Sequence, residues 1–458
     1  MLRSRSCLAL FLASAWMASP AAAREHVAGP PAEDAFLASL VEEAWSRNPD
    51  LRAARQEAAA ARTRPDQVRA LPDPMVSLAY TNDGWSPTLG ERDMANLAVI
   101  WSQDLPFPGK RRLRGEIAER DADRAELRAE RARLAVTASV KRAYYGLLLA
   151  RALLGLIDEQ AEVWKQIEGV ARARYTVGQG AQQDVVRTQV EVTRIGRLQA
   201  EQEAEAEVRL AELNRLLDRA AGTPLDPPDV LLLRPLSEDP SVAVERLRSI
   251  SPELKSAGIA RDREGLAVAL ARKDFKPDLT LQAGYMNRGG LDPMWQASVG
   301  VRLPLARKAR NGTLAEARAR LGAAEQRSAA VHLQLRYRTE QRLAEIRAAE
   351  RIAVLYENGI IPQDQMSVEA AVASYQTGKL PFVAVLEALG TLYGDRSSYL
   401  RLVAGHARAR ASLEEASLEP TADLPTMDTA AAGGAGAPMG AGMGNGTTAG
   451  GSRSMEGR

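Results

Sequence analysis

Several short motifs occur twice in this 458-residue chain, about 200 residues apart. Asn48-Pro49-Asp50-Leu51 is matched by Ser251-Pro252-Glu253-Leu254, and Tyr175-Thr176-Val177-Gly178 is matched by Tyr375-Gln376-Thr377-Gly378. Two further pairs follow the same spacing: Pro72-Asp73 with Pro277-Asp278, and Leu105-Pro106 with Leu303-Pro304. Because one unit is repeated, both halves should fold into the same succession of elements. The pattern predicts long helices around two short strands in each half.

The two ends of the chain differ in composition from the rest. Residues 1–23 are typical of a secretory signal peptide, with a basic start, a short apolar stretch and small residues before Arg24. Residues 420–458 are rich in Gly, Ala, Thr and Met and should form a disordered tail. Between them we expect a first helix-strand-strand-helix repeat over 24–235 and a second over 236–419. No later segment has the roughly 18 uninterrupted apolar residues of a membrane-spanning helix.

The residue types needed for catalysis or metal binding are scattered. The single cysteine, Cys7, lies in the predicted signal, and His26, His332 and His406 show no metal-ligand spacing. No nucleophile elbow or phosphate-binding glycine loop occurs. The formal net charge of +2 predicts no nucleic-acid partner. The sequence therefore predicts no enzyme, no catalytic residue, no cofactor and no metal site.

The tail offers one alternative to this prediction. Its four methionines could supply soft thioether ligands for Cu(I), although irregularly spaced methionines in such a segment are more often only part of a tail. They are Met427, Met439, Met443 and Met455.

The helical segments are unusually long. Residues 110–176 contain no proline and keep a helical apolar rhythm, which predicts a rod of roughly 100 Å. A turn at Gly178-Gln179-Gly180 should reverse the chain into a helix over 182–217. The second half should repeat this from Lys308 to a return helix ending near Leu418. We expect a break at Asn358-Gly359 and a turn at Gly378-Lys379-Leu380-Pro381.

Four segments alternate apolar and polar residues with a period of two. In 295–303 the apolar positions share one face, and 279–286, 76–81 and 97–102 follow the same pattern. Each run is about nine to eleven residues, the length of a strand that crosses a bilayer at a tilt. Four aromatic residues should mark strand ends in an interfacial girdle: Trp85, Trp101, Tyr285 and Trp295.

Four strands cannot close a barrel, and an open sheet edge is not tolerated in lipid. If these strands enter a membrane, several copies of the chain must share one barrel. Two copies would supply eight strands and three would supply twelve. The residues alone leave the number of copies open. They also leave open a half-buried sheet of a soluble protein, which is the simpler interpretation of any one strand.

The repeat resembles the TolC-type outer-membrane efflux ducts over about residues 36–418. The second-half motif from Tyr375 to Tyr393 carries most of the likeness, and it includes Gly378, Leu380 and Glu387. Leu71-Pro72-Asp73-Pro74 and the run from Gln103 to Arg111 are similar to the heavy-metal efflux branch of resistance-nodulation-division systems.

The resemblance implies a mainly α fold with a membrane β-barrel portion. Three chains would form a shared 12-stranded β-barrel in the outer membrane of a Gram-negative bacterium, and an α-barrel tunnel in the periplasm. The homotrimer would contact outer-membrane lipid, a periplasmic adaptor (membrane fusion) protein and an inner-membrane resistance-nodulation-division pump. Its function would be that of a passive duct exporting heavy-metal cations or small toxic compounds.

The resemblance also implies roles for residues at the helical turns. Glu387 would form a ring of three carboxylates inside the periplasmic mouth. Asp184 and Tyr375 would link the two tips in the closed state, and Lys379 would stand in for the basic residue that the family carries at the position of Leu380. The adaptor would dock on the tips, at Gly178, Gln179, Gly180, Gly378, Lys379 and Leu380.

Two other function classes remain open at this point. A soluble periplasmic coiled-coil adaptor would account for the long helices but not for the alternating strands. A passive trimeric outer-membrane pore would account for both and would need no pump. Fractionation with outer membranes separates the first from the others.

Overall fold

The computed structural model describes residues 32–83, 85–89, 91, 93–227, 231–236 and 239–416. The predicted signal peptide, and the predicted tail with its four methionines, lie outside the described residues. The predicted repeat boundaries at residues 235 and 419 also fall outside these ranges, or beside a gap in them, and stay predictions.

The two halves have the same order of elements, as the duplicated motifs predict. The first half contains α1 (Ala32–Arg47), α2 (Pro49–Arg69), β1 (Met75–Thr81), β2 (Asn96–Leu105), α3 (Lys110–Thr176) and α4 (Gln182–Leu216). The second contains α5 (Pro240–Ile250), α6 (Pro252–Lys273), β3 (Asp278–Arg288), β4 (Leu291–Arg302), α7 (Arg307–Leu355), the π-helical turn η1 (Tyr356–Ile360), α8 (Ile361–Gln376) and α9 (Phe382–Glu414).

One repeated motif is a helix start. Asn48 caps α2, and its side-chain oxygen accepts a hydrogen bond of 3.1 Å from the backbone N–H of Leu51. Ser251 caps α6 in the same way, accepting a hydrogen bond of 3.3 Å from Leu254. In both copies a proline follows the cap, where its missing N–H removes no helical hydrogen bond. The duplicated residues therefore start equivalent helices at equivalent places.

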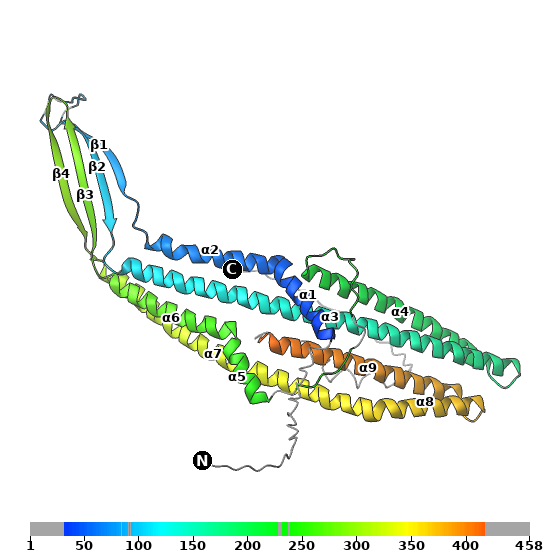
Figure 1. The fold of residues 1–458 in the computed structure, drawn as a ribbon. Coiled ribbons are helices and arrows are strands. Elements are labelled where there is room, and N and C mark those ends of the chain that lie inside the picture. The colour runs from blue at the N-terminus through cyan, green and yellow to red at the C-terminus, as the bar shows by residue number, and fades with distance from the viewer. Residues whose placement is uncertain are drawn as a thin grey trace, which may run out of the picture.

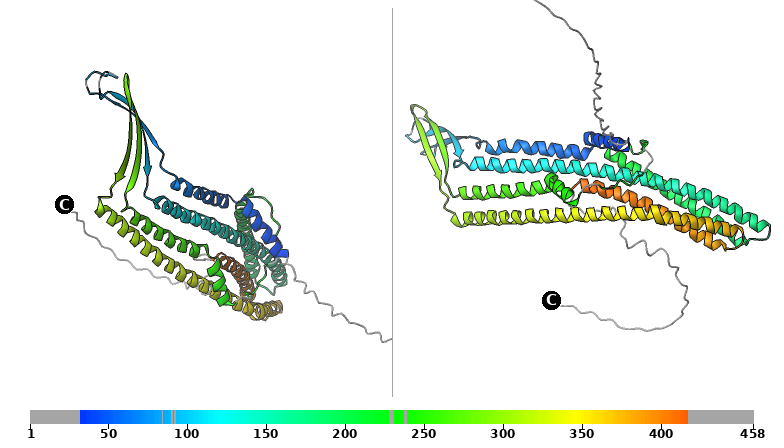
Figure 2. Two further views of the ribbon diagram at one scale, coloured as in Figure 1. Left: turned by 60° about the vertical axis from the view of Figure 1, so that its left-hand side comes forward. Right: turned by 60° about the horizontal axis from the view of Figure 1, so that its bottom comes forward.

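The helices form an elongated rod with the sheet at one end (Figures 1 and 2). The 67-residue α3 runs through both halves of this rod, over a length of about 100 Å. Near the sheet, α3 packs between α2 and α6, and α6 packs against α7. Toward the other end, α3 packs between α4 and α9, and α9 packs against α8. The chain thus presents a layer of four helices in each half of the rod.

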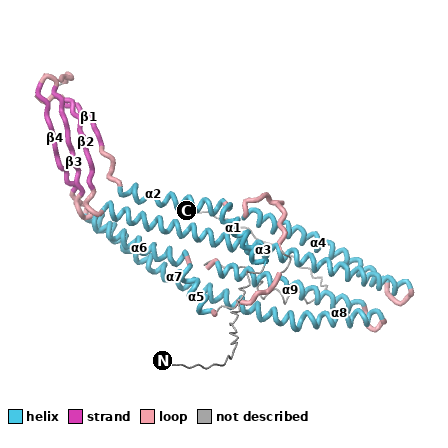
Figure 3. The backbone as a smooth tube through the Cα atoms, in the orientation of Figure 1, coloured by secondary structure: helices cyan, strands magenta, loops and turns pink. Residues whose placement is uncertain are grey.

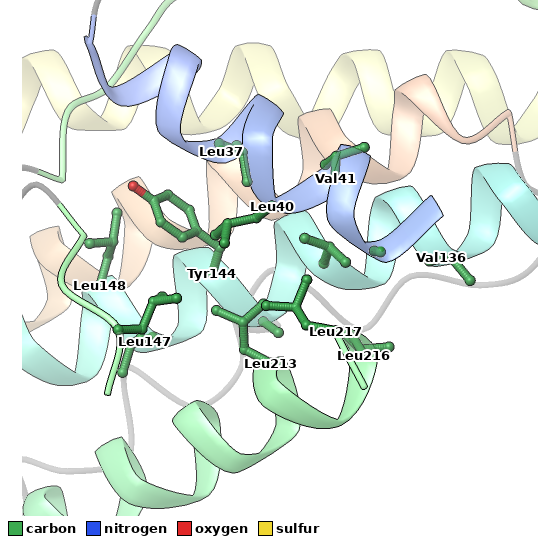
Figure 4. Close-up of a cluster of buried hydrophobic side chains, with 14 residues drawn as sticks. Leu37, Leu40, Val41, Val136, Tyr144, Leu147, Leu148, Leu213, Leu216 and Leu217 are labelled. Carbon is green, nitrogen blue, oxygen red and sulfur yellow. The ribbon is translucent and has the colours of Figure 1, made fainter. Parts of the chain in front are cut away.

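Buried side chains form separate clusters along the rod instead of one central core. The cluster in Figure 4 joins α1, α3 and the end of α4 near the middle of the molecule, around the fully buried Tyr144 and Leu213. A second cluster joins α3 and α4 to α8 and α9 near their turns and includes Trp164, Tyr375 and Phe382. Smaller clusters join α5 with α7 and α9, and α6 with α7. The rod is held by local contacts repeated along its length.

Three boundaries differ from the sequence-based expectation. The predicted break at Asn358-Gly359 was wrong: the helix continues through η1 into α8. Pro362 lacks the N–H that an α-helix would donate to the carbonyl of residue 358, and a wider π turn accommodates this loss. Helix α9 ends at Glu414, before Leu418, and β1 has 7 residues, fewer than predicted.

The four strands form one antiparallel sheet in the order β1-β2-β3-β4 (Figure 3). The register places apolar residues opposite one another, as in the pairs Leu78 with Val99 and Leu281 with Val299. This face is exposed in the single chain: Leu78 is 70% and Val299 65% accessible. Within the described chain, β1 and β4 are the edge strands.

The aromatic side chains of the sheet are placed partly as predicted. Tyr285 lies opposite Trp295 near the β3–β4 turn, and their rings meet edge to face with centroids 5.5 Å apart. Trp101 was wrongly placed at a strand end, since it lies in the middle of β2 opposite Val76. The aromatic pair therefore marks only the hairpin end of the sheet.

A charged contact fixes the base of the sheet to the rod. Lys110, the first residue of α3, is buried, and its ammonium group donates to Asp278 of β3 over 2.9 Å. The same carboxylate accepts a hydrogen bond of 2.7 Å from the backbone N–H of Phe107. Gly109 adopts a left-handed φ of 90° just before the helix, a conformation that favours glycine. The motif around residues 106–111 thus joins the first half of the chain to the second.

None of the helices in the described ranges combines the length and the apolar character that a membrane-spanning helix needs.

The exposed apolar face yields a test of membrane insertion. Replacing Val299 by Arg places a charge on that face. If the sheet enters a bilayer, as the sequence predicts, the charge costs about 2–4 kcal/mol per site at mid-bilayer, and we expect the yield of the predicted oligomer to fall. Gln296→Arg, on the opposite face and across from Gly284, should assemble normally. Analytical ultracentrifugation in detergent measures both; a stable monomer for the unmodified chain, or equal yields for the two variants, would contradict the expectation.

Candidate functional site

The end of the rod opposite the sheet consists of two turns of the same geometry. At the first turn, the backbone N–H of Gln179 donates to the carbonyl of Arg174 over 2.9 Å. At the second, the N–H of Lys379 donates to the carbonyl of Ser374 over the same distance. Gly178 and Gly378 have φ values of 73° and 75°, which side chains with a Cβ rarely adopt. The duplicated glycines therefore end α3 and α8 in the same way.

A side-chain hydrogen bond links the first turn to the second. The phenol of Tyr375, at the end of α8, donates to the Asp184 carboxylate in the first turn of α4 over 3.2 Å. Burial raises the pKa of Tyr375, and the charge of Asp184 raises it further. The phenol therefore stays protonated and able to donate at neutral pH. The structure brings together the two residues that the resemblance paired.

Arg174 makes a second link, which the sequence reasoning missed. Its guanidinium carbon lies 4.5 Å from the centre of the Tyr375 ring, close enough for a cation–π contact. The guanidinium also donates to the backbone carbonyl of Tyr375, and to that of Gln179 over 3.0 Å. One side chain of the first half thus binds both turns. The signal in the sequence was its position, directly before the repeated tyrosine, where the second half has Ser374.

The duplicated tyrosines have different environments. Tyr375 is 3% accessible and packs on Phe382, with ring centroids 5.3 Å apart. Its counterpart Tyr175 is 47% accessible, and its hydroxyl has no hydrogen-bond partner among the described residues. Only the second-half tyrosine therefore forms part of the link between the turns. We call the contacts among Arg174, Tyr375 and Asp184 the tip contact.

The other predicted residues lie at the surface of the same end. Gln179, Gly180, Lys379 and Leu380 occupy the exposed or half-exposed turns. Lys379 forms no hydrogen bond or ion pair with Asp184 in the described chain, and the basic side chain that contacts Tyr375 is Arg174. Glu387 is exposed on the second turn of α9, and its carboxylate forms no ion pair with any described residue.

A pair of carboxyl groups joins α8 to α9 further from the turns, near η1. Burial raises the pKa of Asp395, and the neighbouring Asp364 raises it further through a hydrogen bond and its charge. One oxygen of Asp364 is buried without a hydrogen-bond partner. The contact between the helices is therefore favoured when the pair holds a proton, and it weakens as pH rises. Sequence reasoning missed this pair because the two residues lie on different helices.

The described ranges contain no group of three or more His, Cys, Asp or Glu side chains placed to hold a metal ion. The arrangement at the tips instead consists of contacts that can hold two helical hairpins together or release them. Together with an elongated rod and an amphipathic sheet at its far end, it is the arrangement of a subunit of a membrane-anchored helical duct.

Comparisons with known proteins place this duct subunit in a family. The outer membrane efflux protein family matches residues 40–219 and again 243–417. The chain is 23% identical over 335 residues to the cobalt-zinc-cadmium resistance protein CzcC of Cupriavidus metallidurans, covering 73% of this chain and 78% of that protein. The two matches of the family coincide with the two halves of the duplicated sequence.

Solved structures share the fold. The outer membrane protein VceC of Vibrio cholerae superposes with a TM-score of 0.72 at 20% identity, over 83% of this chain and 96% of that one. The outer-membrane channel OprN superposes with a TM-score of 0.70 at 19% identity, over 84% and 90% of the two chains. The chain belongs to the outer membrane efflux protein family. It is an efflux channel component of the outer membrane of a Gram-negative bacterium, as the resemblance predicted.

The tip contact yields a test of gating. Tyr375→Phe removes the donor to Asp184 and keeps the ring, so a hydrogen bond of about 1 kcal/mol is lost. We expect a higher open probability in single-channel recordings. Asp184→Asn should act in the same direction, and the double variant should add little because both changes remove one bond.

Tyr175→Phe is the matched control, because it makes the same change at the exposed counterpart in the first half. If Tyr375→Phe and Asp184→Asn both gate like the unmodified chain, the tip contact does not stabilise the closed state.

Proposed function

We propose that three copies of this chain form a duct that carries heavy-metal cations or small toxic compounds out of the cell, without any catalytic step. The observation that carries the proposal is an open four-stranded sheet with an exposed apolar face, placed at the end of a rod of about 100 Å. The sheet must find further strands in a bilayer, since its edges cannot face lipid. Three copies would supply a closed barrel of twelve strands.

The polar face of the sheet supports a water-filled passage. Thr280 donates to Asp104 over 2.6 Å, and Ser298 lies 3.3 Å from Gln282 on the same face. In a closed barrel with the apolar face toward lipid, these side chains would line the lumen. The helical layers would then continue the passage as a tunnel in the periplasm.

The direction of transport requires a source of energy outside this chain. A duct is passive, so we infer that the tips meet a periplasmic adaptor and, through it, an inner-membrane pump of the resistance-nodulation-division class. The likeness to a protein named for cobalt, zinc and cadmium resistance supports divalent metal cations as the cargo. A soluble adaptor is a different class of protein and does not agree with membership of the outer membrane efflux family.

The mouth of the duct would carry a ring of three Glu387 carboxylates. Each is exposed and unpaired in the described chain. If α9 faces the threefold axis at the mouth, as the family resemblance implies, assembly would bring the three like charges together. Such a ring attracts cations. The position one helical turn before it is Ala384, so the chain supplies one ring of this kind.

Replacing Glu387 by Gln keeps the size of the side chain and removes the ring's charge. We expect lower cation selectivity and weaker block by multivalent cations in single-channel recordings. Glu369→Gln, an exposed acid of α8 without an ion-pair partner in the described chain, is the matched control. Unchanged cation selectivity in Glu387→Gln would show that Glu387 forms no ring of charges at the mouth.

The docking role of the tips is tested in cells. A strain lacking the gene should become sensitive to cobalt, zinc or cadmium salts and recover when the gene is restored. The double variant Gln179→Glu/Lys379→Glu should assemble into trimers yet fail to restore resistance, because it adds a negative charge at one turn and reverses the charge at the other, where the adaptor would bind. Lys255→Glu, an exposed lysine of α6 far from the tips, should restore resistance. Full resistance in the double variant would show that the tips do not contact the adaptor.

A further inference from the structure

A groove of about 700 Å³ lies on the rod between the sheet and its middle. Its floor is α6, which packs between α3 and α7. Three of the α6 residues that face the groove are small and recur at helical spacing: Ser256, Ala257 and Ala260. Its walls carry arginines from both neighbours. The groove lies far from the turns and uses none of the residues of the tip contact.

Positive charge dominates the walls. Five guanidinium groups line the groove: Arg124, Arg128 and Arg131 from α3, and Arg320 and Arg327 from α7. Two carboxylates line it as well, Glu253 and Glu264. Both already have cationic partners, since Glu253 pairs with Arg131 over 2.7 Å and Glu264 pairs with Arg263 over 2.6 Å. The carboxylates therefore leave most of the positive charge in the groove uncompensated.

Three of these arginines have no partner within the described chain. Arg124, Arg128 and Arg327 form neither a hydrogen bond nor an ion pair with any residue that the structure describes. The Nε atom of Arg124 is also buried without an acceptor. A buried donor of this kind is costly to leave unpaired, whereas some other arginines of these helices, such as Arg112 and Arg320, pair with acids four residues away.

Apolar side chains occupy the space between the guanidinium groups. Leu127 of α3 and Ala323, Ala324 and Val331 of α7 face the same groove as Ala257 and Ala260. An inorganic anion would use the arginines and leave this surface bare. A neutral apolar molecule would leave the arginines without acceptors. The volume lies in the range of pockets that bind small organic ligands.

We propose that this groove binds an amphipathic organic anion, with its carboxylate or phosphate group held by Arg124, Arg128 and Arg327 and its apolar body lying on α6. Guanidinium groups bind both head groups through paired N–H donors, so both kinds of anion share the required chemistry. A groove with this charge repels metal cations, so it would not itself hold the proposed cation cargo. Binding would bridge α3 and α7, which flank α6 on opposite sides.

Isothermal titration of the full-length trimer in a non-ionic detergent tests the proposal. The probes are 2-naphthoate and 2-naphthyl phosphate, with empty micelles titrated as the blank. We expect saturable binding that weakens at high salt, and a preference between the two probes identifies the head group. Neutral 2-naphthalenemethanol and inorganic phosphate, which supply only the body or only the head, should each bind at least tenfold more weakly.

Variants assign the binding to the groove. Arg124→Gln/Arg128→Gln should weaken binding at least tenfold, and Arg327→Gln on the opposite wall provides an independent test. Arg318→Gln is the matched control, because Arg318 is an exposed arginine of α7 outside the groove with no ion-pair partner in the described chain. Equal affinity in all variants, or equal binding of the neutral probe, would overturn the proposal. Trimer mass and metal resistance, measured in parallel, separate this outcome from a failure of the duct function.

Discussion

The length of α3 is the constraint on which the rest of the structure depends. A continuous helix of 67 residues cannot be enclosed by a globular core, so every other element must pack along it. The same helix begins at the base of the sheet, where Lys110 is tied to Asp278, and ends at the tip, where Arg174 contacts Tyr375. Helix α3 therefore connects the sheet, which is expected to lie in the membrane, with the tip of the rod, which is expected to open.

Because the described residues form several clusters and no single central core, the stabilising contacts are distributed along the rod. Separate clusters of buried side chains hold the middle and the tip half. A structure of this kind can change locally, since breaking contacts in one cluster leaves the others intact. The tip contact is well placed for such a change, because it joins the hairpin of α3 and α4 to that of α8 and α9. It consists of one hydrogen bond, one cation–π contact and one contact to a backbone carbonyl. The carboxyl pair between α8 and α9 adds a contact that depends on pH.

Much of the fold could be predicted from the sequence because its signals are local and repeated. The capping residues Asn48 and Ser251, the glycines at the turns and the alternation of the strands each act within a few residues. The break predicted at Asn358-Gly359 was wrong because a proline can be absorbed by a π turn when neighbouring helices hold the segment. The position of Trp101 was wrong because strand ends are set by pairing with partner strands, which no local signal specifies.

The sequence by itself determined the duplication, the helical rods, the turns that reverse them and the amphipathic strands, since each depends on neighbouring residues and on periodicity. Its resemblance to a family also predicted that Asp184 and Tyr375 would contact each other. The tertiary structure alone decided that Tyr375 is buried while its copy Tyr175 is exposed, and that Arg174 is the basic partner at the tip. It alone gathered the arginines of α3 and α7 around one face of α6. The reason is physical: two copies of one motif become different only when each is packed against a different neighbour.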